Sequence, residues 1–126
     1  MATVSKVIRQ KYAEGFNSQL INLFKELTLM YPDNKDFKYI LTQIRLISST
    51  TFELPIQTYE MNFKDYRTHL NEKNENFFLE FNLQNTPLKD LDYLKEIWKT
   101  TSDKTKQAMW RYFFILDKLS MKYHGL

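Results

Sequence analysis

Apolar residues recur at helical spacing along most of the chain, and each run ends at a residue that favours a turn. From residue 16 to residue 31 they stand three and four positions apart, which places them on one face of a helix. Pro32 ends this pattern, because proline cannot continue the helical hydrogen-bond ladder. The stripe consists of Phe16, Leu20, Leu23, Phe24, Leu27, Met30 and Tyr31. We therefore expect a first long helix that buries this face.

Two further stripes follow the same pattern. A second helix is predicted to begin between Asn34 and Asp36 and to end at residues 48–51, whose hydroxyl side chains favour caps and turns. A third begins shortly before Pro55, which suits a first helical turn because no amide donor is needed there. The second stripe is Phe37, Ile40, Leu41, Ile44 and Ile47, and the third is Ile56, Tyr59, Phe63, Tyr66 and Leu70.

The C-terminal part begins with an asparagine-rich segment, residues 71–85, for which we expect a loop with one short helical turn. Thr86 followed by Pro87 then has the pattern of a helix start. Ser102 with Asp103 indicates the start of the last helix. The stripes are Leu88, Leu91, Leu94, Ile97 and Trp98, and then Met109, Tyr112, Phe113, Leu116, Leu119 and Tyr123. The sequence therefore predicts an all-α fold, an irregular antiparallel bundle of four to five helices.

Composition agrees with one folded unit. At 126 residues with 43% apolar and 16% aromatic side chains, the chain can bury a core without disulfides, and it has no cysteine to form one. Residues 1–15 are polar and basic, and we expect a basic arm or a short helix there, followed by a single helical domain over residues 16–126. No apolar run approaches the roughly 20 residues that cross a bilayer, so we expect no membrane insertion.

Several aromatic and apolar residues fall outside the main stripes. On the last helix Trp110, Phe114 and Met121 form a second stripe, about a quarter turn from the first. Either this helix is central in the bundle, or it presents a face to a partner. Phe77 and Phe78, in the irregular segment, pose the same two alternatives. These five residues are the candidate protein-interaction residues, because aromatic anchors dominate interface energetics.

The usual constituents of catalytic and metal sites are missing. There is no cysteine and no Gly-x-Ser-x-Gly motif for nucleophilic catalysis, and two glycines cannot build a phosphate-binding loop. His69 has Asp65 and Glu72 at helical spacing, but no second histidine stands near them, so a solvated surface cluster is the expectation. We expect no enzyme activity, no catalytic residue, no metal and no cofactor.

Charge is divided unevenly along the chain. Basic residues outnumber acidic ones by four to one in residues 1–25 and by seven to three in residues 95–126, whereas residues 26–94 have seven basic and eleven acidic. Cations that neutralise phosphates, with aromatic residues that stack bases, would suit nucleic acid. The candidates are Lys99, Lys104, Lys106, Arg111, Lys118 and Lys122. By elimination a protein partner is the main expectation, nucleic acid is the alternative, and the oligomeric state stays open.

Four short motifs resemble a family of small uncharacterised proteins encoded by nucleocytoplasmic large DNA viruses, the giant viruses of algae and protists. They are residues 16–20 (FNSQL), residues 31–33 (YPD) with Asp36, residues 76–79 (NFFL), and Trp98 followed by residues 110–112 (WRY). The resemblance runs from about Phe16 to Tyr123, and the AT-rich codons of the favoured residues agree with it. The resemblance implies a structural protein associated with the virion or a protein-interaction protein. It implies a location in the cytoplasm or nucleus of the infected host cell, or in the virion. It assigns no functional residue.

Overall fold

The computed structural model describes residues 2–80 and 89–125, and all regular secondary structure within these ranges is helical. The elements are α1 (Ala2–Met30), α2 (Lys35–Thr50), α3 (Leu54–Phe63), the 3-10 helix η1 (Lys64–Tyr66), α4 (Arg67–Asn71), α5 (Glu75–Glu80), the 3-10 helix η2 (Lys89–Tyr93), α6 (Leu94–Trp98) and α7 (Asp103–His124). Among these, α1, α2, α3 and α7 have ten residues or more. The predicted all-α helical bundle is confirmed.

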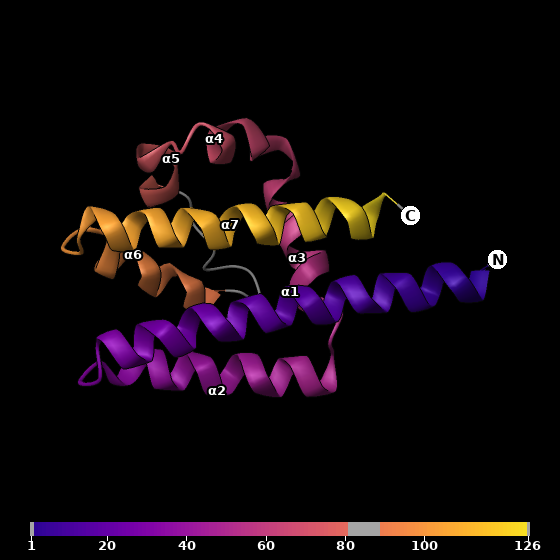
Figure 1. The fold of residues 1–126 in the computed structure, drawn as a ribbon, viewed down its shortest axis with the longest axis horizontal. Coiled ribbons are helices and arrows are strands. Elements are labelled where there is room, and N and C mark those ends of the chain that lie inside the picture. Colours follow the sequence, from indigo (N-terminus) through magenta and orange to yellow (C-terminus); the bar gives the residue numbers. More distant parts are fainter. Residues whose placement is uncertain (1, 81–88, 126) are drawn as a thin grey trace.

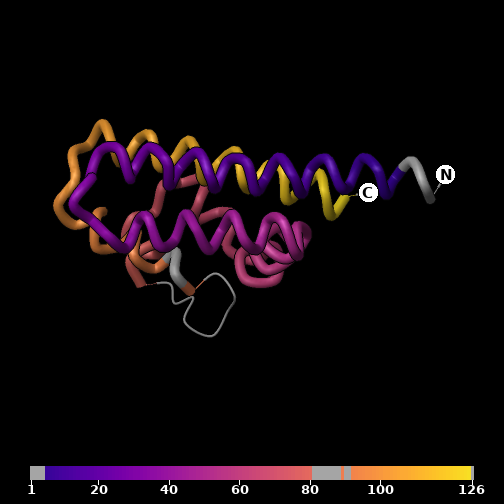
Figure 2. The backbone as a smooth tube through the Cα atoms, turned by 90° about the horizontal axis from the view of Figure 1, so that it is seen from below, coloured from indigo at the N-terminus to yellow at the C-terminus, as the bar shows by residue number. Residues whose placement is uncertain are grey.

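Helix α1 is the central element of the arrangement. It runs antiparallel to α2 on one side and to α7 on the other (Figure 1). Seen from the perpendicular direction, α1 and α7 lie side by side in one layer, and α2 with the shorter helices lies beneath them (Figure 2). One side of the α1–α7 layer is therefore not covered by any other described element.

The ends of two helices follow from capping residues that the sequence displays. Asn34 precedes α2, and its Oδ1 accepts hydrogen bonds from the amides of Asp36 and Phe37, at 3.0 and 3.3 Å. Ser102 precedes α7, and its Oγ accepts from the amide of Thr105 at 3.2 Å. Each side chain satisfies backbone donors that have no partner within the helix, which fixes where the helix begins.

The core consists largely of the predicted stripes. It contains Phe16, Leu20, Leu23, Phe24 and Leu27 of α1, Phe37, Ile40, Leu41 and Ile44 of α2, Ile56 and Tyr59 of α3, and Met109, Leu116 and Tyr123 of α7. Two stripe positions differ from expectation, since Met30 and Tyr66 are exposed. Met30 is the last residue of α1, and Tyr66 lies where the predicted third helix changes to 3-10 geometry, so both leave the apolar face.

Residues 2–15 belong to helix α1 and do not form a segment that precedes it. The C-terminal half of α7 lies alongside them. The guanidinium of Arg9 lies 5.7 Å from the ring centre of Tyr123, and Lys122 Nζ lies 6.0 Å from that of Tyr12. Ala13 is completely buried in this contact region. The alternatives for residues 1–15 were an arm or a short helix; residues 2–15 are instead the first part of the long helix α1, with no break before residue 16.

Between α3 and α7 the chain forms short helices. Lys73 has a φ of 53°, in the left-handed region, and the reversal at this residue separates α4 from α5. Within residues 71–80, helix α5 corresponds to the short helical turn expected in the asparagine-rich segment. The predicted start at Thr86 and Pro87, and the stripe position Leu88, lie outside the described residues. The stripe resumes with Leu94, Ile97 and Trp98, which are buried on α6.

Candidate functional site

One side of α7 presents cations and apolar side chains to solvent together. On an α-helix, residues seven or eighteen positions apart return to nearly the same side, because one turn takes about 3.6 residues. Five exposed residues share this side, and exposed Met121 lies at its edge, three positions after Lys118; the five are Lys104, Arg111, Ile115, Lys118 and Lys122. We refer to these six residues as the outer face of α7.

The exposed acidic residue of α7 is Asp103, its first residue, which lies eighteen positions before Met121 and therefore at the same edge of the outer face. From Lys104 to Gly125 the chain contains one acidic residue, Asp117. That carboxylate is buried, and it accepts hydrogen bonds from Tyr59 Oη at 3.0 Å and from Arg67 Nε at 2.9 Å. Its charge is therefore compensated from the inner side of α7 and is not available to the cations outside.

The six predicted cations divide into two groups. Lys99 forms an ion pair with Glu96 at 3.5 Å, and Lys106 Nζ lies 3.1 Å from the Glu75 carboxylate. The other four, Lys104, Arg111, Lys118 and Lys122, form no ion pair with the residues that the structure describes. The structure thus brings four of the predicted cations together on the outer face and assigns two to local ion pairs.

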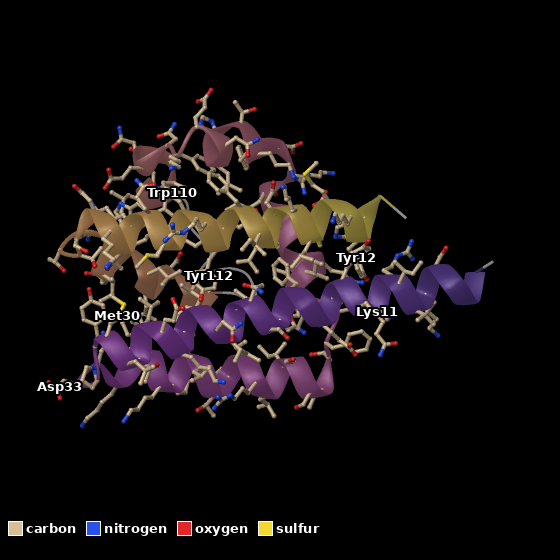
Figure 3. All side chains as sticks on the ribbon, in the orientation of Figure 1. Lys11, Tyr12, Met30, Asp33, Trp110 and Tyr112 are labelled. Carbon is tan, nitrogen blue, oxygen red and sulfur yellow. The ribbon has the colours of Figure 1, made fainter. Side chains whose placement is uncertain are left out.

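The neighbouring helix α1 contributes one acidic group near this surface. Glu26 lines a shallow groove between α1 and α7 together with Lys104 and Arg111. Burial raises the pKa of the Tyr112 hydroxyl to about 12, and its hydrogen bond to Glu26 and the charge of that carboxylate add to the effect. Figure 3 shows Tyr112 between the two helices. Glu26 thus holds Tyr112 and reduces the positive charge only at one end of the outer face.

The predicted second stripe of α7 does not stay on one surface. Trp110 is 4% exposed, and its ring packs against that of Trp98 with the centroids 5.1 Å apart. Phe114 is half-buried and stacks on Trp110, with the centroids 6.5 Å apart. Met121 is 52% exposed. The stripe therefore runs from the core at Trp110 to the solvent at Met121. Met121 and the exposed part of Phe114 are accessible to a partner, and Trp110 is not.

Phe77 and Phe78 of α5 face the body of the protein and are half-buried. The Phe78 ring lies against Trp98 at 4.8 Å between centroids. The Phe77 ring stacks on His69 at 4.6 Å with an angle of 11°. Both phenylalanines line a partly open cavity of about 90 Å³, so much of each ring faces this cavity and the core.

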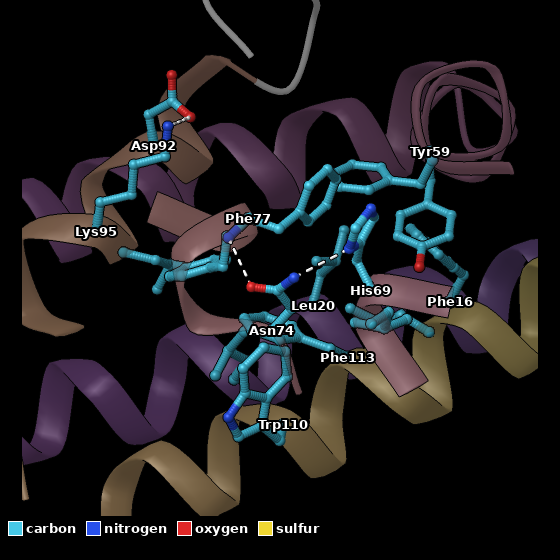
Figure 4. A pocket seen from close by; sticks show the side chains of 16 residues that line it. Phe16, Leu20, Tyr59, His69, Asn74, Phe77, Asp92, Lys95, Trp110 and Phe113 are labelled. Atoms are coloured by element: carbon cyan, nitrogen blue, oxygen red, sulfur yellow. Dashed lines mark hydrogen bonds and ion pairs between the residues drawn. The ribbon is translucent and has the colours of Figure 1, made fainter. Parts of the chain in front are cut away.

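His69 belongs to a local hydrogen-bonded group and not to the predicted carboxylate cluster. The Asn74 amide nitrogen donates to His69 Nδ1 at 3.0 Å, while Asn74 Oδ1 accepts from the amide of Phe77 at 3.1 Å (Figure 4). The second contact fixes the orientation of the Asn74 amide, so Nδ1 of His69 is the acceptor. No group of three or more metal-ligating side chains occurs in residues 2–80 and 89–125.

A partly buried ionic network is a feature that the sequence reasoning missed. Arg67 donates through Nη1 and Nη2 to the Glu60 carboxylate and through Nε to Asp117. Ser120 donates to Glu60 Oε2 at 2.8 Å. Burial by itself raises the pKa of Glu60, but the hydrogen bonds from Arg67 and Ser120 outweigh it and the pKa is lowered. A sequence signal was present, because Asp117 and Ser120 interrupt the apolar side of the last helix.

The network of Arg67, Glu60, Asp117, Ser120 and Tyr59 holds three helices together. It joins α3, α4 and α7 through charge-assisted hydrogen bonds, which are stronger than neutral ones. Its groups satisfy one another, and burial together with the Asp117 charge raises the pKa of the Tyr59 hydroxyl far above its ordinary value. A phenol held protonated in this way is a fixed donor to the carboxylate.

Comparison with known proteins adds no assignment to this geometry. No family model, no curated protein sequence and no solved structure matches the chain. Among the helices that the structure describes, none combines the length and the apolar character needed to span a bilayer.

Proposed function

We propose that this protein is a non-enzymatic interaction protein that binds an acidic segment of a protein partner through the outer face of α7. The observation that carries the proposal is the mixture on that face, where Ile115 and Met121 are 43% and 52% exposed among four cations without ion pairs in the described part of the chain. Such a surface suits a partner that brings carboxylates and apolar side chains together.

The length of the outer face suits a helical partner segment. Lys104 and Lys122 are eighteen residues apart, which corresponds to about 27 Å along the helix axis. An amphipathic helix of similar length could cover Ile115 and Met121 with its apolar side and place its carboxylates beside the flanking cations. Burial of the apolar pair would supply affinity, and the charges would supply orientation and a faster association rate.

Nucleic acid is the second candidate, and the four aligned cations favour it. If all four neutralise phosphates, the logarithm of the binding constant should fall with the logarithm of salt concentration with a slope of about −3 to −4. The exposed Ile115 and Met121 favour protein instead, because a phosphate backbone offers no apolar surface to cover them. The two candidates therefore differ in whether binding depends on the apolar pair.

The viral context is part of the same proposal and rests on the resemblance of the sequence motifs. It is tested by probing purified virions and fractions of infected cells with an antibody against this protein. Recovery in virions, or in the cytoplasm or nucleus of infected cells, supports it. Detection of the protein in uninfected cells alone would contradict it.

The binding experiment is an affinity capture from infected-cell lysate, with and without nuclease and at two salt concentrations, with matched variants. Ile115→Ser together with Met121→Ser should reduce capture of the protein partner at least about tenfold, since two apolar anchors are lost. Leu46→Ser is the control, because Leu46 is similarly exposed on α2. Partner capture that survives nuclease but is unchanged in the double variant would contradict a role for this face.

A second set of variants reverses charge. Arg111→Glu with Lys118→Glu should weaken either kind of complex, and Lys38→Glu on α2, also exposed, is the matched control. Recovery that collapses with nuclease, shows the steep salt dependence and is unaffected by Ile115→Ser and Met121→Ser would replace the protein partner by nucleic acid.

A further inference from the structure

The cavity of about 90 Å³ lies on the opposite side of α7 from the outer face. Residues of α1, α3, α4, α5, α6 and α7 surround it, and Figure 4 shows Trp110 and Phe113 directed toward it. Leu20, Leu23 and Leu116 form part of its wall and are 4% exposed or less, so the space extends into the core. Arg111, Ile115 and Lys118 do not line it, and it is therefore separate from the proposed partner surface.

The part of the cavity wall that the described residues form is almost entirely hydrocarbon. Polar groups at its margin are engaged with one another: Asn74 donates to His69, and Lys95 Nζ lies 3.3 Å from the Asp92 carboxylate. The Tyr59 hydroxyl is directed to Asp117 and away from the space. A polar ligand would lose its hydrogen bonds to water and find few replacements, which is unfavourable.

Unfilled apolar space that reaches into a core is unfavourable. Cores are packed as densely as organic crystals, and side chains that border a void lose dispersion contacts. Water does not compensate for the loss, because it needs two to four polar partners to occupy a cavity. A cavity of about 150 Å³ lined by Leu, Ile and Phe stays dry and binds benzene or xenon. The present cavity is smaller but has the same lining chemistry.

We propose that this cavity is a binding site for a small apolar molecule or group, of the size of one aromatic ring or a short alkyl chain. The aromatic rings of Phe63, Phe77 and Trp110 offer flat faces and edges to such a ligand. A charged or strongly polar ligand is disfavoured by the wall. The site does not depend on the proposed function of α7, because none of the outer-face residues contributes to it.

Binding is tested on the full chain with toluene and with xenon, followed by the methyl NMR signals of the leucines. The expected result is a saturable shift of the methyl signals of Leu20, Leu23 and Leu116, together with a rise in melting temperature. Leu46 and Met121 are exposed and remote from the cavity wall, so their methyl signals serve as the internal reference and should not move.

A filling variant with a matched control tests the location. Leu70 is half-buried and lines the cavity, whereas Leu79 is half-buried against the same core and does not line it. Leu70→Phe should weaken toluene binding at least about tenfold, and Leu79→Phe should leave it within about twofold. The titration of the unaltered protein decides the matter even if a variant fails to fold.

Two results would overturn the proposal. One is the absence of any shift at saturating toluene and at high xenon pressure, which would mean that the space is closed or filled. The other is a shift that does not saturate and affects the exposed methyl groups equally, which would mean adsorption to the surface. A shift confined to the cavity leucines and weakened by Leu70→Phe supports it.

Discussion

Arg67 is the single cation that compensates two carboxylates inside the α3–α4–α7 junction. Its guanidinium contacts Glu60 through two nitrogens and Asp117 through the third. The Arg67 and Glu60 side chains are 21% and 17% exposed, and Asp117 is 6% exposed, so solvent screens these charges only in part. Replacement of Arg67 by methionine keeps much of the side-chain volume and removes the charge and all three donors.

The expected loss is large because the two carboxylates remain. Removing one partner of a buried ion pair costs about 3–5 kcal/mol, and the partial exposure of Glu60 places the expectation near the lower end. Ser120 and Tyr59 still donate to Glu60 and Asp117, which also limits the loss. A loss of about 3 kcal/mol corresponds to a decrease in melting temperature of roughly 10 °C for a chain of this length.

The pH dependence separates this mechanism from a simple packing defect. The pKa of Glu60 in the folded protein lies below its ordinary value of 4.5, so the network contributes stability above that pH and loses it as the pH falls through the lowered pKa. Without Arg67, burial of Glu60 dominates and raises its pKa, so protonation relieves the variant. The difference in stability between the two proteins should therefore shrink from pH 7 to about pH 4.

The assay is urea unfolding followed by far-ultraviolet circular dichroism at both pH values. Arg45→Met is the matched control, because Arg45 is exposed on α2 and should change stability by less than about 0.5 kcal/mol. Adding Asp117→Asn and Glu60→Gln to Arg67→Met should recover part of the loss, because the uncompensated charges are then gone. A loss below about 1 kcal/mol, or a loss independent of pH, would refute this account of the network.

Three further predictions concern the helices. A Cβ added at Gly15 would lie 3.8 Å from the Leu119 methyl groups, which is an ordinary contact. Gly15→Ala should therefore raise the free energy of unfolding by about 0.5–1 kcal/mol, measured by thermal unfolding. A loss of stability would mean that α1 and α7 approach more closely than this. Asn34→Ala removes the acceptor of two backbone amides and should cost about 1 kcal/mol in urea unfolding, whereas an unchanged midpoint would show that the cap is dispensable. Tyr112 should ionise near pH 12 in an absorbance titration of the folded protein, and the stability that its raised pKa contributes should decline as the pH rises above 10. Glu26→Gln should lower that pKa, and an unaltered titration would argue against the contact.

The sequence determined the class of fold and most of the helix positions, because these depend on local signals. The apolar stripes at helical spacing correspond to the buried faces of α1, α2 and α7. The caps at Asn34 and Ser102 act within three residues along the chain, so their effect can be inferred without tertiary structure. The third helix was expected to continue to Leu70, but the structure has short helices from Lys64 to residue 80 and again from Lys89 to Trp98.

The division of the last helix into sides was decided only by tertiary structure. Periodicity placed Trp110, Phe114 and Met121 in one stripe, but the position of neighbouring helices determines which of them solvent can reach. Trp98, twelve residues earlier in the chain, covers Trp110, whereas no described element covers Met121. Asp117 lies on the inner side of α7 by its position in the helix, but the compensation of its charge there requires Arg67, fifty residues away.

The cavity and the ionic network were beyond the reach of the sequence for the same physical reason. Each is formed by side chains from elements distant along the chain, and periodicity describes only positions on one element. Glu60 and Arg67 are seven residues apart, but their interaction with Asp117 requires α3, α4 and α7 to meet. Local sequence thus determined which helices form and which faces are apolar, while packing determined which charges are compensated, which apolar residues remain exposed and where space is left in the core.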